Sequence, residues 1–542
     1  MPIGAEPFGI LSIIPPLLAI VLAIVTRRVI LSLFLGVWSG AIIFTGGLGI
    51  AQALDWMIGN IADSWYATLI VFNLLMGAGV GIIWKLGGSL ALSNWAANRF
   101  KNERQVGLTA WILGMLVFFN DYANTAIVGS AMKDVAARMR ISKEKLSYIV
   151  DSTAAPVSTF LISDWIAYQL GMIQKGYENA GIAGLESTPS TFTAFLNSIP
   201  FNMYCLFAII LVGIIVYTRR DYGEMLDAEH RSWTTGQVIR EDGNPMQTIE
   251  LDVGEPSQKN PMLKSFVIPI VALVAITLFG VWFTGRGPDK TILDIVGSAA
   301  WVKSLMWGAF AMVTSGMAIG LGYGILDLEE TMDNFTNGLK IMMTAVTILV
   351  LAWSIGTATD QLGTADFVIG VSEGIVTPSI LPVVILIASA IIAFSTGTSW
   401  GTMAIVTPIA IPMAYEFTGG FTMVYVIVGT TFSGAIFGDH CSPISDTTVL
   451  SSIFTGSDHI DHVRTQIYYA VTALADAFIL LLVWGLTGIS PFILIPVGIV
   501  ILYGAVYFFS EWDSKRKGIP AKPTDADRER VMKEIKEAAK AE

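Results

Sequence analysis

The sequence predicts an all-α polytopic membrane protein with about 11 transmembrane helices plus two re-entrant hairpins, arranged in two inverted repeats. Composition gives the first indication: 54% of the 542 residues are hydrophobic and only 14% are charged, whereas soluble proteins carry about 25% charged residues. The second indication is a series of apolar segments long enough to cross a bilayer. The third is a pair of apolar segments that polar residues interrupt halfway.

The apolar segments define the candidate spans, because a membrane-spanning helix needs roughly 20 apolar residues. The candidates are 10–26, 29–45, 67–84, 146–171, 200–218, 264–284, 304–322, 341–359, 423–455, 465–486 and 489–510. The fourth and the ninth contain polar interruptions. Two further segments, 105–137 and 380–414, are interrupted in the middle, and each half is short for a full crossing.

The distribution of Lys and Arg sets the expected orientation, because cytoplasmic loops carry an excess of both residues. Arg27 and Arg28 place the first loop in the cytoplasm and the N-terminus outside. Basic residues flank segment 105–137 at both ends, so this segment is expected to enter from the cytoplasm and return there. Segment 380–414 has no Lys or Arg near either end and is expected to enter from outside. The same rule places the C-terminus in the cytoplasm.

These assignments divide the chain into six parts. They are N-terminal transmembrane helices (1–66), a first inverted repeat (67–218) with hairpin 105–137, a cytoplasmic linker (219–263), further transmembrane helices (264–340), a second inverted repeat (341–510) with hairpin 380–414, and a charged cytoplasmic tail (511–542).

Short sequence matches in a common order support the repeat. The tripeptide AIV follows both hairpin tips, at 126–128 and at 404–406, and a Pro-containing element follows later in each half, at 155–158 and at 442–445. Because the expected orientations are opposite, the repeats are inverted. Transporters with inverted repeats and broken helices bind their substrates near the membrane midplane, at the repeat interface.

Three sequence elements resemble the NhaC-type Na+/H+ antiporter family: NDYANTAIVGS at 120–130, DSTAAPVS at 151–158 and GDHCSPISDTTVLSS at 438–452. The resemblance extends over roughly residues 10–510. It implies a secondary active transporter of the plasma (inner) membrane that exchanges Na+ for H+ by alternating access. It also implies a scaffold domain, a transport domain that moves in an elevator-like manner within the lipid bilayer, and the homodimer that is common in the superfamily.

The chemistry of Na+ predicts which residues form the site. A hard cation requires oxygen ligands, and Pro156 and Pro443 each free backbone carbonyl groups one turn upstream. A buried carboxylate binds either ion, because burial favours the neutral acid and a bound cation favours the anion. We expect Na+ at Asp121, Asp151, Asp439 and Asp446. The other predicted ion-binding or proton-coupling residues are Asn120, Asn124, Ser152, Thr153, Thr357, Asp360, Ser395, Thr396, Thr398, Ser399, His440, Ser442, Ser445 and Thr447.

Two other functions remain to be weighed. A Na+- or H+-coupled carrier of a small carboxylate or amino acid would use the same fold, although the inferred core contains no Arg to bind an anion. A hydrolase with paired aspartates would leave the inverted repeat unexplained, so no enzyme activity is expected. Neither a cofactor, apart from the transported Na+, nor a nucleic-acid partner is expected.

A DHIDH sequence at 458–462 has the composition of a metal site. It falls between two predicted spans, in a cytoplasmic loop. We therefore expect a solvated cluster of loop residues here rather than a metal site.

Overall fold

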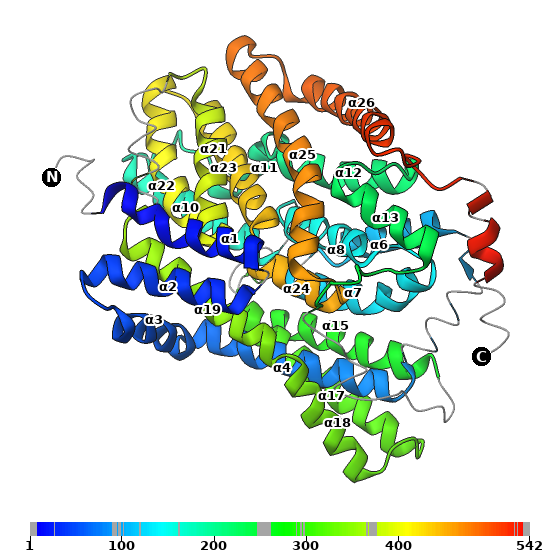
Figure 1. Cartoon of the computed structure of the whole chain (residues 1–542). Helices are drawn as coiled ribbons and strands as arrows, with labels where there is room; N and C mark the ends of the chain where they lie inside the picture. The colour runs from blue at the N-terminus through cyan, green and yellow to red at the C-terminus, as the bar shows by residue number, and fades with distance from the viewer. Residues whose placement is uncertain are drawn as a thin grey trace.

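The computed structural model describes residues 8–26, 28–88, 91, 95, 99–100, 102–118, 121–160, 163–245, 262–288, 290–292, 295, 299–364, 367, 377–524, 526–527 and 529–534. Within these residues the regular structure is entirely helical (Figure 1), so the predicted all-α class is confirmed. Among the described helices, six are long and apolar enough to cross a membrane, or up to eight if each bent pair counts as one span. The total of about 11 spans, the inverted layout and the domain boundaries stay predictions.

One group of helices, here called the first group, occupies the lower left and the bottom of Figure 1. It consists of α1 (Ile14–Thr26), α2 (Val29–Thr45), α3 (Ile50–Ala62), α4 (Ser64–Lys85), α15 (Lys264–Gly285), α17 (Trp301–Gly322), α18 (Leu328–Ile341) and α19 (Met343–Gln361). A short 3-10 helix, Gly9–Ile13, precedes α1. Buried apolar side chains of these helices share one core.

The remaining helices, here called the second group, fill the rest of the molecule around a second apolar core. They are α6 (Glu103–Leu116), α7 (Asp121–Arg138), α8 (Lys143–Ser152), α9 (Ala155–Ser158), α10 (Asp164–Asn179), α11 (Thr191–Ser198), the 3-10 helix Ile199–Phe201, α12 (Met203–Thr218), α13 (Glu224–Thr235), α21 (Leu381–Thr396), α22 (Ser399–Thr418), α23 (Phe421–Cys441), α24 (Asp446–Thr455), α25 (His459–Thr487) and α26 (Pro491–Lys517).

Both predicted hairpins are pairs of helices, and their interruptions lie where the sequence places them. In the second hairpin, Gly397 ends α21 with a positive φ of 70°, a conformation that glycine adopts without steric cost. Thr398 then caps α22, because its Oγ1 accepts the backbone N–H of Gly401 at 3.4 Å. The first hairpin is interrupted between α6 and α7. The side from which each hairpin enters the membrane stays a prediction.

The predicted polar interruptions of the fourth and ninth spans are also confirmed as breaks. The first lies between α8 and α9, next to Pro156, and the second lies between α23 and α24, around Pro443. Helix α23 packs closely on α21: a Cβ added to Gly438 would lie 2.4 Å from the backbone nitrogen of Phe394. The second break is therefore held against the tip of the second hairpin.

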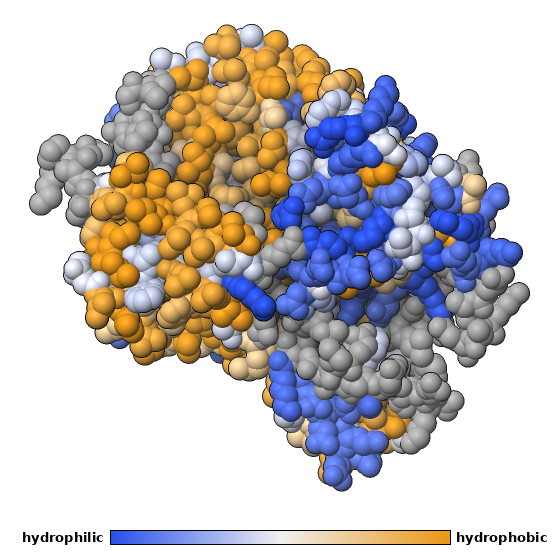
Figure 2. All heavy atoms as spheres, in the orientation of Figure 1, coloured by the Kyte–Doolittle hydropathy of each residue, from blue (hydrophilic) through white to orange (hydrophobic). Residues whose placement is uncertain are grey.

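Figure 2 shows that hydrophilic residues gather over α13 and its surroundings, whereas hydrophobic residues cover the face formed by α1, α2 and α3. Helix α13 lies in the segment expected to be a linker, and it is packed rather than free. Its Glu229 approaches Lys145 of α8, which also binds Asp221 at 2.7 Å. Burial opposes the charge on Lys145, but these two carboxylates outweigh that effect and raise its pKa above the ordinary value.

Candidate functional site

Asp439 lies at the last turn of α23 and is only 2% exposed. Its two carboxylate oxygens each accept one hydroxyl hydrogen bond at 2.6 Å, Oδ2 from Ser399 and Oδ1 from Ser445. Ser399 begins the second half of the hairpin α21–α22, and Ser445 caps α24 directly after the break. One carboxylate therefore joins the tip of the second hairpin to the broken helix.

Asp446 is the first residue of α24 and faces the first hairpin. Its Oδ2 accepts the phenolic O–H of Tyr122 at 2.7 Å. Tyr122 follows Asp121, which is completely buried at the start of α7. The start of α7 in the first hairpin thus contacts the same break as the tip of the second hairpin.

Asp151 forms the third buried carboxylate of the site, near the end of α8. Its Oδ2 accepts the side-chain amide of Gln466 at 2.8 Å and the hydroxyl of Thr448 at 3.2 Å. The Thr448 hydroxyl also lies 3.3 Å from the backbone carbonyl oxygen of Asp439. A single threonine therefore connects the α8 break to the α23–α24 break.

The imidazole of His440 links the two broken helices to α12. Its Nε2 lies 2.9 Å from Ser152 Oγ and its Nδ1 lies 2.7 Å from the hydroxyl of Tyr204. Asn124 fixes the first hairpin in a similar way, since its side-chain amide donates to the carbonyl of Thr153 at 2.8 Å and to that of Gly114 at 2.6 Å. These contacts hold Ser152 and Thr153 next to the hairpin.

The structure brings most of the other predicted residues to the same region. Ser442 donates to the carbonyl of Phe394 at 2.8 Å, within the second hairpin. The remaining predicted residues near the hairpin tip and the break are Ser395, Thr396, Thr398 and Thr447, of which Ser395, Thr396 and Thr447 are buried.

Two predicted residues are placed on α19, and a third, Asn120, lies outside the described residues. Thr357 is bound to Asn60 of α3 at 3.1 Å, within the first group of helices. Asp360 is exposed near the end of α19.

Sequence reasoning missed several hydrogen-bond partners in the site. Tyr122, Thr448 and Gln466 bind aspartates, and Tyr204 binds His440. Gln466 carried a usable signal, because a glutamine within an apolar helix needs an internal hydrogen-bond partner. Tyr122 and Thr448 lie within the elements at 120–130 and 438–452, so their region was identified although their partners were not.

The expectation of a solvated cluster at 458–462 is wrong. His459 and His462 are buried, with exposed fractions of 2% and 0%. Asp458 caps α25 by accepting the N–H of Asp461 at 3.0 Å, so the helix begins earlier than the predicted span. The two imidazoles turn inward and both approach Ser452, as described below.

Electrostatics suit the site to a cation. Within the described residues, Asp151, Asp439 and Asp446 have neutral hydrogen-bond partners, and none forms an ion pair with Lys or Arg. No group of three His, Cys, Asp or Glu side chains in that part of the chain has the arrangement of a metal centre. A bound ion would therefore use hydroxyl and backbone oxygens beside one or two carboxylates, which suits an alkali cation.

Comparisons with known proteins identify the family of this chain. A profile of the Na+/H+ antiporter family matches residues 157–486, more than half of the chain. An uncharacterized protein of Haemophilus influenzae is 31% identical over 512 residues, which cover 91% of this chain and 95% of the relative. Two further relatives match over shorter regions. The malate-2H(+)/Na(+)-lactate antiporter of Bacillus subtilis is 33% identical over 31% of this chain and 35% of its own length. The Na(+)/H(+) antiporter NhaC of Alkalihalophilus pseudofirmus is 30% identical over 30% of this chain and 34% of its own length.

Broken helices and helical hairpins that meet at carboxylates are typical of secondary transporters of the membrane, and the matched family and the named relatives are transporters rather than enzymes. The chain belongs to the Na+/H+ antiporter family. The resemblance seen in the three sequence elements is thereby confirmed.

Proposed function

We propose that the protein exchanges Na+ for H+ across the membrane by alternating access. One observation supports this most directly: the buried carboxylate of Asp439 is bound only by hydroxyl groups, from Ser399 and Ser445. A hydroxyl has both a proton and lone pairs, so it turns to offer oxygen to a cation without leaving its place. The same three residues therefore solvate either the free carboxylate or a Na+ beside it.

The proposal assigns different roles to the aspartates. Na+ binds at Asp439 and Asp446, with the hydroxyls of Ser399 and Ser445 and the carbonyl groups of the break as further ligands. Asp121 supports this set at the first hairpin. Asp151 carries the proton, because a titratable imidazole approaches it: Nε2 of His462 lies 3.8 Å from Asp151 Oδ2. Thr448 couples Asp151 to the Na+ ligands.

The packing between the two groups of helices suits an elevator-like movement. The side of α24 that faces α19 and the first group is apolar, with Val449, Leu450 and Phe454 buried in the core of that group. The hydroxyl and amide partners described above for Asp439, Asp446 and Asp151, in contrast, belong to the second group. If the second group moved relative to the first group, it would carry the ion site intact, and the apolar surfaces between the two groups would slide past each other.

A second candidate function is exchange or cotransport of a small carboxylate with Na+ or H+. The similarity to a malate-2H(+)/Na(+)-lactate antiporter favours it. On this proposal the aspartates would bind the coupling ions, as above, and the organic acid would be a further substrate.

The test is ion flux in liposomes that contain the purified protein and an internal pH dye. An outward Na+ gradient should drive H+ uptake without any organic solute, and an equal K+ gradient should not. Asp439→Asn should lower this flux by about 100-fold or more, because a neighbouring charge in a partly buried site is worth several kcal/mol to a cation. Asp55→Asn, at an exposed position of α3, is the matched control and should behave as wild type. Flux that appears only after malate or lactate is added would favour the second candidate.

A further inference from the structure

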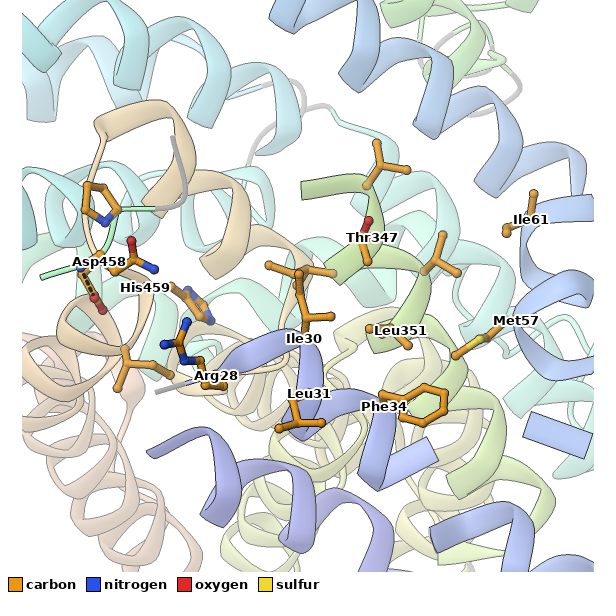
Figure 3. A pocket seen from close by; sticks show the side chains of 16 residues that line it. Arg28, Ile30, Leu31, Phe34, Met57, Ile61, Thr347, Leu351, Asp458 and His459 are labelled. Atoms are coloured by element: carbon orange, nitrogen blue, oxygen red, sulfur yellow. Dashed lines mark hydrogen bonds between the residues drawn. The ribbon is translucent and has the colours of Figure 1, made fainter. Parts of the chain in front are cut away.

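A cavity of about 1130 Å³ opens between the first group of helices and the beginning of α25. Its larger part is apolar, with Leu31 and Phe34 of α2 opposite Leu351 of α19. Figure 3 shows that its polar lining gathers at one end, where Arg28, Asp458 and His459 lie close together. Water that enters this cavity therefore meets an imidazole at its polar end.

The hydrogen bonds of His459 fix which ring nitrogen carries a proton. Nε2 lies 2.9 Å from the carbonyl oxygen of Pro443, within the break between α23 and α24. A carbonyl only accepts, so Nε2 carries the hydrogen and donates it. In the neutral ring, Nδ1 is then an acceptor, and it lies 3.1 Å from Ser452 Oγ.

A continuous chain of hydrogen bonds runs from Ser452 to Asp151. Ser452 Oγ lies 2.8 Å from Nδ1 of His462, whose Nε2 lies 2.8 Å from Gln466 Oε1. The amide nitrogen of Gln466 donates to Asp151 and to the carbonyl of His440, so its oxygen must accept from His462. His462 Nε2 itself is 3.8 Å from Asp151 Oδ2.

The hydroxyl of Ser452 has a single hydrogen atom but three neighbours that could accept a hydrogen bond from it. Three groups act as acceptors toward its hydroxyl when both imidazoles are neutral: the carbonyl of Thr448 at 2.7 Å, and Nδ1 of His459 and of His462. A hydroxyl donates only one hydrogen bond. One additional proton on Nδ1 of His459 turns that nitrogen into a donor, and the serine hydroxyl is then free to donate to His462.

We propose that the cavity is the port through which protons reach the ion site, and that His459 is the residue that takes them up. The proposal rests on the proposed Na+/H+ exchange and adds its proton path. A proton from water in the cavity binds to His459, moves through the Ser452 hydroxyl to His462, and ends on Asp151. In the last step the imidazolium of His462 turns its Nε2–H from Gln466 Oε1 toward Asp151 Oδ2, which lies 3.8 Å away. That N–H bond breaks and an O–H bond forms on the carboxylate, so charge and atoms balance without another reactant.

The surroundings of His459 are compatible with a transient positive charge. Asp458 precedes it on the chain, and this carboxylate already accepts the backbone N–H groups of Asp461 and Asn244. The other charged or titratable groups near it are His462 on its own helix and Arg28 of α2, which shares the cavity.

The experiment compares two fluxes of the same liposomes. His459→Ala should lower Na+-driven H+ flux by about tenfold or more, the usual scale of a proton-transfer group, while exchange of radioactive Na+ for Na+ stays within a factor of two. Added imidazole enters the cavity and should restore much of the H+ flux of His459→Ala. Ser452→Ala should show the same selective loss without rescue. His230→Ala, on α13, is the matched control and should leave both fluxes unchanged.

The outcomes separate the two proposals. Wild-type protein that exchanges Na+ but moves no H+ would overturn the proposed function and, with it, the path. Wild-type exchange of both ions, with H+ flux intact in His459→Ala and Ser452→Ala, would overturn the path alone. Parallel loss of both fluxes in His459→Ala, with no rescue by imidazole, would likewise make His459 a structural residue.

Discussion

At the scale of single residues, the aspartates differ in which donors they face. Asp439 is bound by serine hydroxyls, Asp446 by a tyrosine hydroxyl, and Asp151 by an amide and a threonine hydroxyl. Asp151 also has an imidazole near it, since Nε2 of His462 lies 3.8 Å from its Oδ2. This neighbour, more than burial, is the reason why the proposed function gives the proton to Asp151 and Na+ to the other two.

This division predicts how Na+ binding depends on pH. The concentration of Na+ that gives half-maximal flux should rise as the pH falls, by less than about tenfold per pH unit, because a proton on Asp151 removes a negative charge close to the proposed Na+ ligands Asp439 and Asp446. Flux measured over a range of Na+ concentrations, from mildly acidic to alkaline pH, checks this expectation. A half-maximal concentration that does not change with pH would mean that the two ions bind independently.

The sequence identified the aspartates because charged residues inside a membrane are costly and therefore functional by default. It did not identify Tyr122 or Gln466 as partners, since they are 324 and 315 residues away from the aspartates that they bind. Contacts between residues so far apart in the sequence depend on how the whole chain folds. His459 was misplaced for a different reason: hydropathy starts the span at 465, but the helix starts six residues earlier, with a buried polar turn.

At the scale of helices, the breaks and hairpins were predictable because proline and polar tips interrupt apolar segments. Helices α3, α13 and α18 were not predictable from the sequence in this way. Helix α3 has only 13 residues and is too short for a span, and α13 and α18 are too polar to register as spans at all. Such helices are stabilised by packing, which a search for apolar segments does not detect.

Close packing of α23 on α21 gives a prediction about glycine. Gly438→Ala should lower thermal stability and flux, because the new methyl group meets backbone atoms on α21, which have no room to retreat. Gly59→Ala, where an added Cβ meets open space on α3, should instead raise stability by about 0.5–1 kcal/mol. Thermal unfolding of both variants in one detergent tests the pair. Equal stability of the two variants would show that α21 adjusts to the larger side chain.

At the scale of the whole molecule, ion pairs gather around α13, whereas Asp151, Asp439 and Asp446 have no Lys or Arg partner among the described residues. The polar layer around α13 joins segments that are distant in the sequence: Lys145 of α8 contacts Asp221 and Glu229, and Arg231 contacts Glu144. These pairs tie α13 to the helix that carries Asp151. The segment between the two halves of the chain thus contributes to holding one half of the site.

The charge cluster around Lys145 gives the last prediction. The pKa of Lys145 is raised in the folded state. The stability that its charge contributes is therefore fully present at neutral pH and is lost only as the pH rises through the pKa of the folded state. Lys145→Met should cost about 3–5 kcal/mol at neutral pH, because it leaves Asp221 and Glu229 buried without a positive charge. Lys340→Met, at an exposed position, should change stability by less than about 0.5 kcal/mol.

A further variant separates the contribution of the Lys145 charge to stability from the contribution of its packed side chain. Adding Asp221→Asn and Glu229→Gln to Lys145→Met removes the uncompensated charges, so most of the lost stability should return. Thermal unfolding of the purified variants measures both steps. If the triple variant is as unstable as Lys145→Met alone, the lysine contributes through its packed side chain, and the tie between α8 and α13 is not electrostatic.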